Sequence, residues 1–143
     1  MPNLLGMGYR TFLYNRIAEL QPDTVIMMNS GIGKGQQYNM EYSWPSDLIA
    51  LERHMPKEDG YEKWRDINGK RHYLPGEACD PIGKNWFLVP DDGPRPDESL
   101  IHQYQDCRQR GVNLLLNVPP DTHGVIPDYH VSALMRLRKA IGR

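Results

Sequence analysis

Apolar residues recur at helical spacing in three long parts of the chain. Between Tyr9 and Leu20 they alternate with polar residues in the pattern of an amphipathic helix. Pro96–Arg110 repeats this pattern and begins with acidic residues, which stabilise the amino end of a helix dipole. Gly111 is placed to end that helix in a left-handed conformation. Asp128–Ile141 is a third segment of the same kind, so the pattern predicts three amphipathic helices.

A shorter helix is predicted over Ser46–His54. Leu48, Ile49 and Leu51 give this segment an apolar side, and its first residues are of the type that caps helix amino ends. Pro56 then prevents the helix from continuing.

Continuous apolar runs predict strands. Thr24–Met28 and Val112–Val118 are apolar on both faces, which is typical of strands in a parallel sheet. His72–Leu74 and Trp86–Val89 are shorter strand candidates, and the polar stretch Lys57–Arg71 predicts an excursion with one exposed hairpin. Alternation of helices and strands predicts an α/β fold, in either a doubly wound sheet or a barrel.

Composition excludes several classes of protein. The 143 residues are well short of the roughly 250 of a complete (β/α)₈ barrel. The chain has 17 basic and 18 acidic residues and therefore no basic excess, so we expect neither nucleic acid nor a membrane as a partner. Cys79 and Cys107 fit no disulfide framework or metal motif, so no metal and no cofactor are expected. Met1-Pro2-Asn3 does not open a secretory signal, and localisation stays open.

Residues that could bind or react with a ligand follow the predicted strands in sequence. In parallel α/β folds, ligands bind outside this carboxyl end of the strands. A glycine-rich segment, Gly31–Gly35, lacks the spacing of phosphate-binding motifs and is interpreted as a flexible active-site loop. Carboxylates, aromatic rings, an amide and a histidine follow the strands. This combination suits a sugar, because its C–H face stacks on a ring while its hydroxyls need planar polar partners. The candidate residues are Glu41, Trp44, Glu77, Trp86, Asn117 and His123.

Three motifs resemble the α-L-fucosidases of glycoside hydrolase family twenty-nine. Gly111–Asp121 with the following turn is similar to the family's G-G-N-L-L-L-N-x-G-P strand and D-G-x-I-P turn. Pro75–Gly83 resembles the W-E-x-C-x-x-I segment, with Gly76 at the tryptophan position. Glu19–Ile26 resembles the E-L-Q-P-D-x-V-I turn. The motifs occur in the family's order through nearly the whole chain.

The resemblance implies that residues 1–143 are the C-terminal portion of a (β/α)₈ catalytic domain whose N-terminal half is missing. The family's nucleophilic aspartate would fall at or just before the first residue, and no aspartate precedes Asp23. Such a half barrel leaves strand edges open, so self-association through these edges is expected. The implied ligand is a fucosylated glycan or a fucoside.

The resemblance also implies roles for individual residues. Retaining hydrolysis needs a nucleophile and an acid/base carboxyl group, and Glu77 or Glu41 is the candidate acid/base. Each candidate has a structural alternative. Glu77 could form a structural ion pair, and Glu41 could be an exposed loop residue. Trp44 and Trp86 could be packing anchors as well as sugar platforms. Asn117 could anchor the loop that follows the last strand. His123 is placed in the final turn, where it could line the pocket.

Three functional interpretations follow. The first is a retaining α-L-fucosidase of which this chain is a part that lacks its nucleophile. The second is a non-catalytic sugar-binding or structural remnant of that fold. The third is an unrelated doubly wound domain that binds a small molecule.

Overall fold

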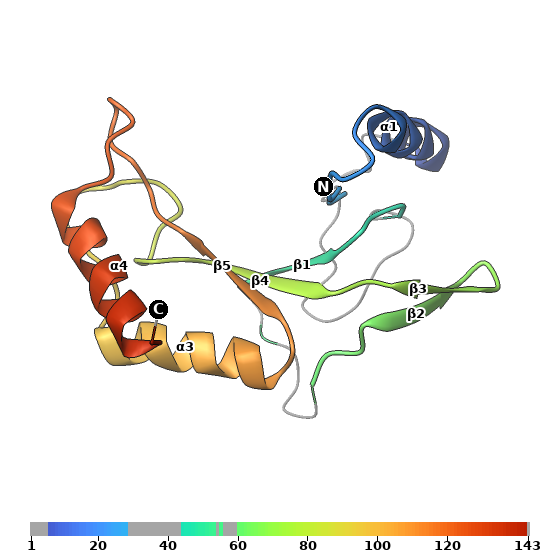
Figure 1. Ribbon diagram of the computed structural model, residues 1–143. Coiled ribbons are helices and arrows are strands. Elements are labelled where there is room, and N and C mark those ends of the chain that lie inside the picture. Colours follow the sequence, from blue (N-terminus) through green and yellow to red (C-terminus); the bar gives the residue numbers. More distant parts are fainter. Residues whose placement is uncertain (1–5, 29–43, 54, 56–59, 143) are drawn as a thin grey trace.

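The computed structural model describes residues 6–28, 44–53, 55 and 60–142 (Figure 1). Its elements in chain order are α1 (Met7–Leu20), β1 (Ile49–Glu52), β2 (Trp64–Ile67), β3 (Lys70–Tyr73), β4 (Gly76–Pro81), α3 (Asp97–Gln109), β5 (Asn113–Asn117) and α4 (Asp128–Ala140). In this part of the chain, no helix combines the length and apolar character needed to cross a bilayer.

A three-stranded parallel sheet forms the centre of the molecule. Its strand order is β1-β4-β5, with β1 and β4 aligned from Ile49 opposite Gly76 and β4 and β5 aligned from Glu77 opposite Asn113. β2 and β3 form a separate antiparallel hairpin, which extends from the sheet near the start of β4 (Figure 1). The predicted α/β fold with parallel strands is therefore confirmed.

The two faces of this sheet differ. Leu51 of β1 and Ala78 of β4 pack with Cys107 of α3 in the main core cluster, so α3 covers this face. Leu116 packs against a second cluster, in which Leu100 of α3 meets Ala133 of α4. α3 and α4 consequently lie together on one side of the sheet, and α1 lies apart from them (Figure 1). We call the side with Leu51 the covered face and the opposite side the open face.

Several predicted elements are confirmed. α1, α3, α4, β5 and the β2–β3 hairpin lie within or close to the segments that the sequence predicted. The amphipathic character predicted for α1 is wrong, because Phe12 and Leu20 are 61% and 63% exposed while Arg10 is buried. Gly111 ends α3 with a positive φ of 70°, as its position predicted. Acidic Asp97 and Glu98 lie in the first turn of α3, where the helix dipole stabilises them.

The strand predicted over Thr24–Met28 is wrong. The segment is extended, but its partners come from residues just before β1. The backbone amide of Ile26 donates to Oδ2 of Asp47 over 2.7 Å, and the amide of Met28 donates to Oγ of Ser46 over 3.0 Å. These side chains take the hydrogen bonds that a neighbouring strand would otherwise make, so no ladder forms.

The helix predicted over Ser46–His54 is also wrong. Its centre is strand β1, in which Ile49 and Leu51 are buried and alternate with less buried residues. Its amide and carbonyl groups pair with β4, and this long-range partner outweighs the local preference. His54 lies outside the described residues.

The strand predicted over Trp86–Val89 is an irregular segment instead. The buried carboxylate of Asp92 shapes it, accepting hydrogen bonds from the amides of Lys84 and Asn85 over 3.0 and 2.8 Å. The strand in this part of the sheet is β4, which the sequence did not predict as a strand of its own.

Candidate active site

A pocket of about 350 Å³ lies on the open face of the sheet. All three parallel strands contribute to it at alternate positions, because successive strand residues point to opposite faces. It is lined by Met27, Ala50, Glu52, Glu77, Cys79, Trp86, Phe87, Leu115 and Asn117. Three of the predicted site residues, Glu77, Trp86 and Asn117, are therefore brought together here.

The two carboxylates of the pocket lie at different heights along the strands. Glu77 is opposite Ala50 and Asn113, where the three strands begin. Glu52 is the last residue of β1 and lies opposite Cys79. Glu52 thus occupies the carboxyl end of its strand, where parallel α/β folds bind ligands, and Glu77 lies toward the amino end.

Cys79 lies under the influence of both carboxylates. Burial raises the pKa of its thiol, and the negative charges of Glu52, Glu77 and Asp80 raise it further. The thiol stays protonated at neutral pH and is a poor nucleophile there. The negative charge of these carboxylates makes the electrostatic potential at the pocket floor negative.

Glu77 has a defined partner. Nδ2 of Asn113 donates a hydrogen bond to its Oε2 over 2.8 Å. This bond joins the second residue of β4 to the first residue of β5 on the open face and holds the Glu77 carboxylate toward Asn113.

Trp86 and Asn117 are linked at the carboxyl end of the sheet. Nδ2 of Asn117 donates to the backbone carbonyl of Trp86 over 2.9 Å, so Asn117 anchors the segment that carries the indole. The Arg53 guanidinium lies 4.8 Å from the centre of the Trp86 ring and donates to the carbonyl of Lys84 over 3.0 Å. The indole is thereby fixed from one side beside the pocket.

The remaining predicted residues lie elsewhere. Trp44 packs its ring edge-on against His72, with centroids 4.7 Å apart, and its carbonyl accepts a hydrogen bond from Nε of Arg10. His123 is exposed in the turn before α4, where its amide donates to Oδ1 of Asp121 over 2.8 Å. Neither lines the pocket. Glu41 lies outside the described residues.

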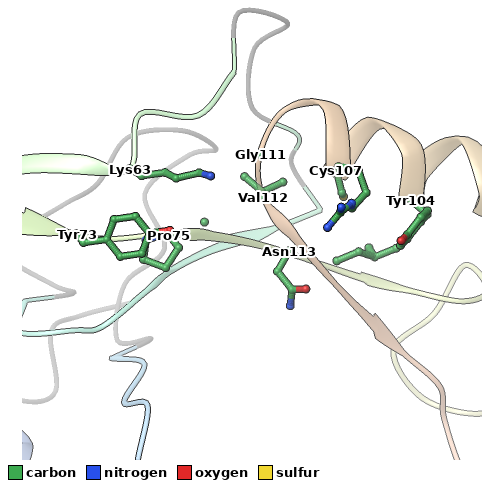
Figure 2. Close-up of a pocket in the computed structure, with 11 residues that line it drawn as sticks. Lys63, Tyr73, Pro75, Tyr104, Cys107, Gly111, Val112 and Asn113 are labelled. Carbon is green, nitrogen blue, oxygen red and sulfur yellow. The ribbon is translucent and has the colours of Figure 1, made fainter. Parts of the chain in front are cut away.

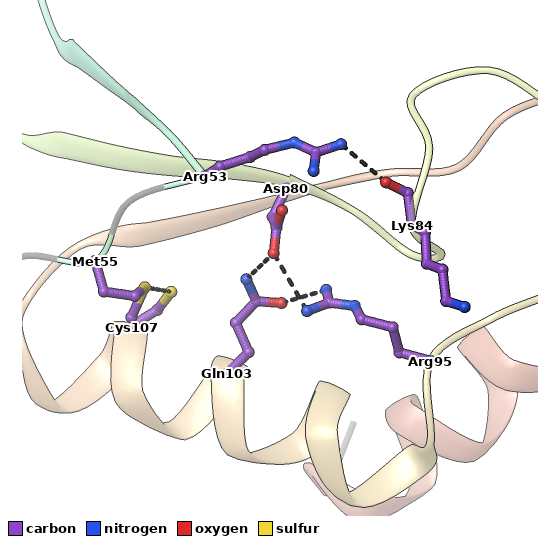
Figure 3. A network of polar contacts seen from close by, with 7 residues as sticks. All are labelled: Arg53, Met55, Asp80, Lys84, Arg95, Gln103 and Cys107. Carbon is purple, nitrogen blue, oxygen red and sulfur yellow. Dashed lines mark hydrogen bonds and ion pairs between the residues drawn. The ribbon is translucent and has the colours of Figure 1, made fainter. Parts of the chain in front are cut away.

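Asp80, next to the pocket in sequence, points to the covered face (Figure 3). Its Oδ2 accepts a hydrogen bond from Nε2 of Gln103 over 2.7 Å and lies 3.2 Å from Nη1 of Arg95. Asp80 therefore ties β4 to α3 and the segment before it.

Sequence reasoning missed Glu52 as a site residue. A helix was predicted at its position, which hid the alternation of Ile49 and Leu51 with Ala50 and Glu52. Read with a period of two, that alternation would have placed Glu52 on the face opposite the core. Among the described residues, no group of three or more His, Cys, Asp or Glu is placed to hold a metal ion.

Fold and pocket together define an α/β protein whose uncovered parallel strands present carboxylates beside an indole, an arrangement suited to a sugar. The sequence matches the family Alpha-L-fucosidase over residues 6–141, and the chain belongs to this family. The resemblance found in its motifs is thus confirmed.

Individual relatives agree with this family. Alpha-L-fucosidase 1 of Arabidopsis thaliana is 26% identical over 126 residues, which are 85% of this chain and 25% of the relative. The solved Alpha-L-fucosidase isoenzyme 1 from Paenibacillus thiaminolyticus matches 99% of this chain and 32% of its own, with a TM-score of 0.73 and 24% identity. Alpha-L-fucosidase AlfC from Lactobacillus casei, solved in complex with alpha-L-fucose product, matches 98% of this chain and 37% of its own, with a TM-score of 0.68 and 22% identity.

The chain therefore spans about a quarter of the length of the Arabidopsis relative and about a third of the two bacterial structures. At these identities the solved structures show the shared fold. The chain corresponds to part of a fucosidase catalytic domain.

Proposed function

We propose that this chain forms the acid/base-bearing part of the active site of a retaining α-L-fucosidase, equivalent to the second half of a (β/α)₈ barrel. The observation that carries the proposal is the open-face pocket, in which Glu52 lies at the carboxyl end of a parallel strand near the indole of Trp86. Membership of the family supports α-L-fucose as the sugar and a fucosylated glycan or fucoside as the substrate.

The proposed chemistry requires two carboxyl groups roughly 5 Å apart on either side of the glycosidic bond. One is the nucleophile that attacks the anomeric carbon. The other first protonates the departing oxygen and then, as a carboxylate, removes a proton from the water that hydrolyses the fucosyl-enzyme. In this proposal the nucleophile is the family aspartate aligned at or before residue 1, supplied by polypeptide on the amino side of this chain.

We assign the acid/base role to Glu52. Its position at the end of β1 matches the end of the sheet where parallel α/β folds bind substrate. Glu77, which the motif indicated, lies two residues nearer the amino end of the sheet, opposite Ala50, and is engaged by Asn113. In the proposal Glu77 shapes the pocket floor, and Trp86 is a platform for the apolar face of fucose.

The test compares Glu52→Gln with Glu77→Gln in the protein extended by its amino-side polypeptide. With an unactivated fucoside, Glu52→Gln should lower kcat by about 10²-fold or more, because leaving-group protonation is lost. An activated aryl fucoside should lose less, and azide should restore turnover only in Glu52→Gln. If kcat fell only in Glu77→Gln, the acid/base role would belong to Glu77, as the motif indicated, and our assignment to Glu52 would be refuted.

Binding is tested separately with fucose and the 143-residue chain. Trp86→Ala should abolish fucose binding, whereas Tyr9→Ala, which alters an exposed aromatic residue of α1 outside the pocket, should not. A second candidate is a non-catalytic sugar-binding remnant of this fold, for which the open-face pocket alone would suffice. Fucose binding with no turnover in the extended protein would support that alternative.

A further inference from the structure

A second cavity, of about 470 Å³, lies at the amino end of the sheet (Figure 2). It opens where β4 and β5 begin, between the β2–β3 hairpin and the end of α3. Its lining residues are Lys63, Tyr73, Pro75, Gly76, Tyr104, Cys107, Arg108, Gly111, Val112, Asn113 and Leu114. We call it the amino-end pocket. It lies at the opposite end of the strands from Glu52 and shares no lining residue with the open-face pocket.

The amino-end pocket has an excess of positive charge. Lys63 and Arg108 contribute cations, and Tyr73 and Tyr104 contribute phenol groups. Its lining, as far as the chain is described, includes no carboxylate. In a protein with 17 basic and 18 acidic residues, this local segregation favours an anionic ligand.

The Lys63 side chain lies over the pocket in the space left by Gly111. Its ammonium points toward Gly111 and Val112 in Figure 2. A Cβ at position 111 would lie 3.2 Å from Nζ and Cε of Lys63, so glycine leaves the room that the lysine occupies. Gly111 also has a φ of 70°, which disfavours a side chain there.

The carbonyl groups at the end of α3 already have partners. The amide of Val112 donates to the carbonyl of Cys107 over 2.9 Å, and the amide of Gly111 donates to that of Arg108 over 3.2 Å. These two carbonyl groups are therefore engaged within the turn. Lys63 and Arg108 oppose the negative end of the helix dipole and provide charged donors for an anion.

An aromatic surface adjoins this positive pocket. Tyr73 lines the pocket and is 51% exposed, and its ring centroid lies 5.1 Å from that of Trp64, which is 48% exposed. The two residues are opposite each other on the hairpin, and the Arg71 guanidinium lies 5.7 Å from the Trp64 centroid. The two ring planes are tilted by 59°, so a sugar face can lie flat on only one of them, and Tyr73 is the ring that lines the pocket.

We infer that the amino-end pocket binds a saccharide that carries a sulfate or phosphate group. The sugar ring stacks on Tyr73, and the oxyanion is held between Lys63 and Arg108. This site is separate from the proposed fucose pocket and does not depend on it. The protein would thus hold a substituted glycan at two places, one at each end of the sheet.

The experiment titrates the 143-residue protein with galactose 6-sulfate, galactose and inorganic sulfate by calorimetry at constant ionic strength. Galactose 6-sulfate should bind at least about tenfold more tightly than either other probe, because only it engages both the cations and the rings. Lys63→Gln and Arg108→Gln should each weaken this binding by about tenfold, and Lys63→Arg should retain most of it. Lys139→Gln removes the same charge from the last turn of α4 and should have no effect.

Four results would overturn the inference. Galactose 6-sulfate could bind no better than galactose, or equally well to the Lys63→Gln protein, which would exclude the cation pair. Inorganic sulfate could bind as tightly as the sulfated sugar, which would reduce the site to one for a free anion. Saturating fucose could displace the sulfated sugar, which would place it in the open-face pocket. Thermal unfolding of each variant verifies that the fold is retained.

Discussion

On the covered face of the sheet, Leu51 and Ala78 are 0% and 2% exposed and pack with residues of α3. On the open face, Leu115 of the same sheet is 45% exposed and lies beside Glu52, Glu77 and Cys79. One face is buried and its polar residue, Asp80, is hydrogen-bonded. The other carries carboxylates with room for a ligand. Along the same short strands, alternate residues thus contribute either to the buried core or to the ligand pocket.

The largest expected effect comes from a matched pair of leucine truncations. Leu51→Ala removes a fully buried side chain from the covered face and should lower the free energy of unfolding by about 3 kcal/mol. Leu115→Ala on the open face should cost only about 1 kcal/mol, because much of that side chain is already hydrated. Urea denaturation measures both. Equal losses would contradict the division of the two faces.

A smaller effect is expected from neutralising one carboxylate on each face. Asp80→Asn leaves Arg95 without its anionic partner in a half-buried network and should lower the free energy of unfolding by about 1–2 kcal/mol (Figure 3). Glu52→Gln should change it by less than about 0.5 kcal/mol, because relief of repulsion with neighbouring carboxylates offsets the lost contacts. Denaturation curves of the two variants in one buffer give the comparison. A larger loss in Glu52→Gln would assign Glu52 a structural role.

The smallest expected effect is a pH dependence on the covered side. His130 of α4 is 1% exposed, and among the described atoms neither ring nitrogen has a hydrogen-bond partner. Burial lowers the pKa of His130, and the charge of Asp92 opposes this shift in part. Because the unfolded chain takes up the proton near pH 6.5 and the folded protein only at lower pH, stability should fall as the pH decreases below about 6.5.

Thermal unfolding between pH 7.5 and pH 5.5 measures this dependence. His130→Leu should reduce the decrease in Tm, since no buried imidazole remains to be protonated. His123→Gln, which removes an exposed histidine from the turn before α4, should leave the decrease unchanged. An identical pH profile in His130→Leu and the original protein would show that burial of His130 is not its cause.

The sequence predicted best the elements whose ends are set locally. α3 begins with acidic residues and ends at Gly111, and α4 follows Pro127 directly, so propensity and capping agree with the final structure. The run Leu114-Leu115-Leu116 was long enough to indicate β5. The family resemblance found in the motifs was also confirmed, because such motifs are patterns of adjacent residues.

The failures occurred where distant partners decide the structure. β1 has only four residues, too few for periodicity to separate helix from strand, and its conformation follows from pairing with β4. Thr24–Met28 had strand composition, but the side chains of Ser46 and Asp47 took its amides. For the same reason Glu52 could not be recognised as a pocket residue from its neighbours in sequence.

By itself, then, the amino-acid sequence determined the α/β class, the main helices, the last strand and the fucosidase family, since these depend on short-range spacing and residue type. The tertiary structure alone decided that Glu52, Glu77, Trp86 and Asn117 share one pocket and that Lys63 and Arg108 line another. Strand register sets which side chains face each other across 27 and 36 residues of chain, as in Glu52 opposite Cys79 and Cys79 opposite Leu115. Pairing over such separations is a property of the folded sheet, and no local pattern encodes it.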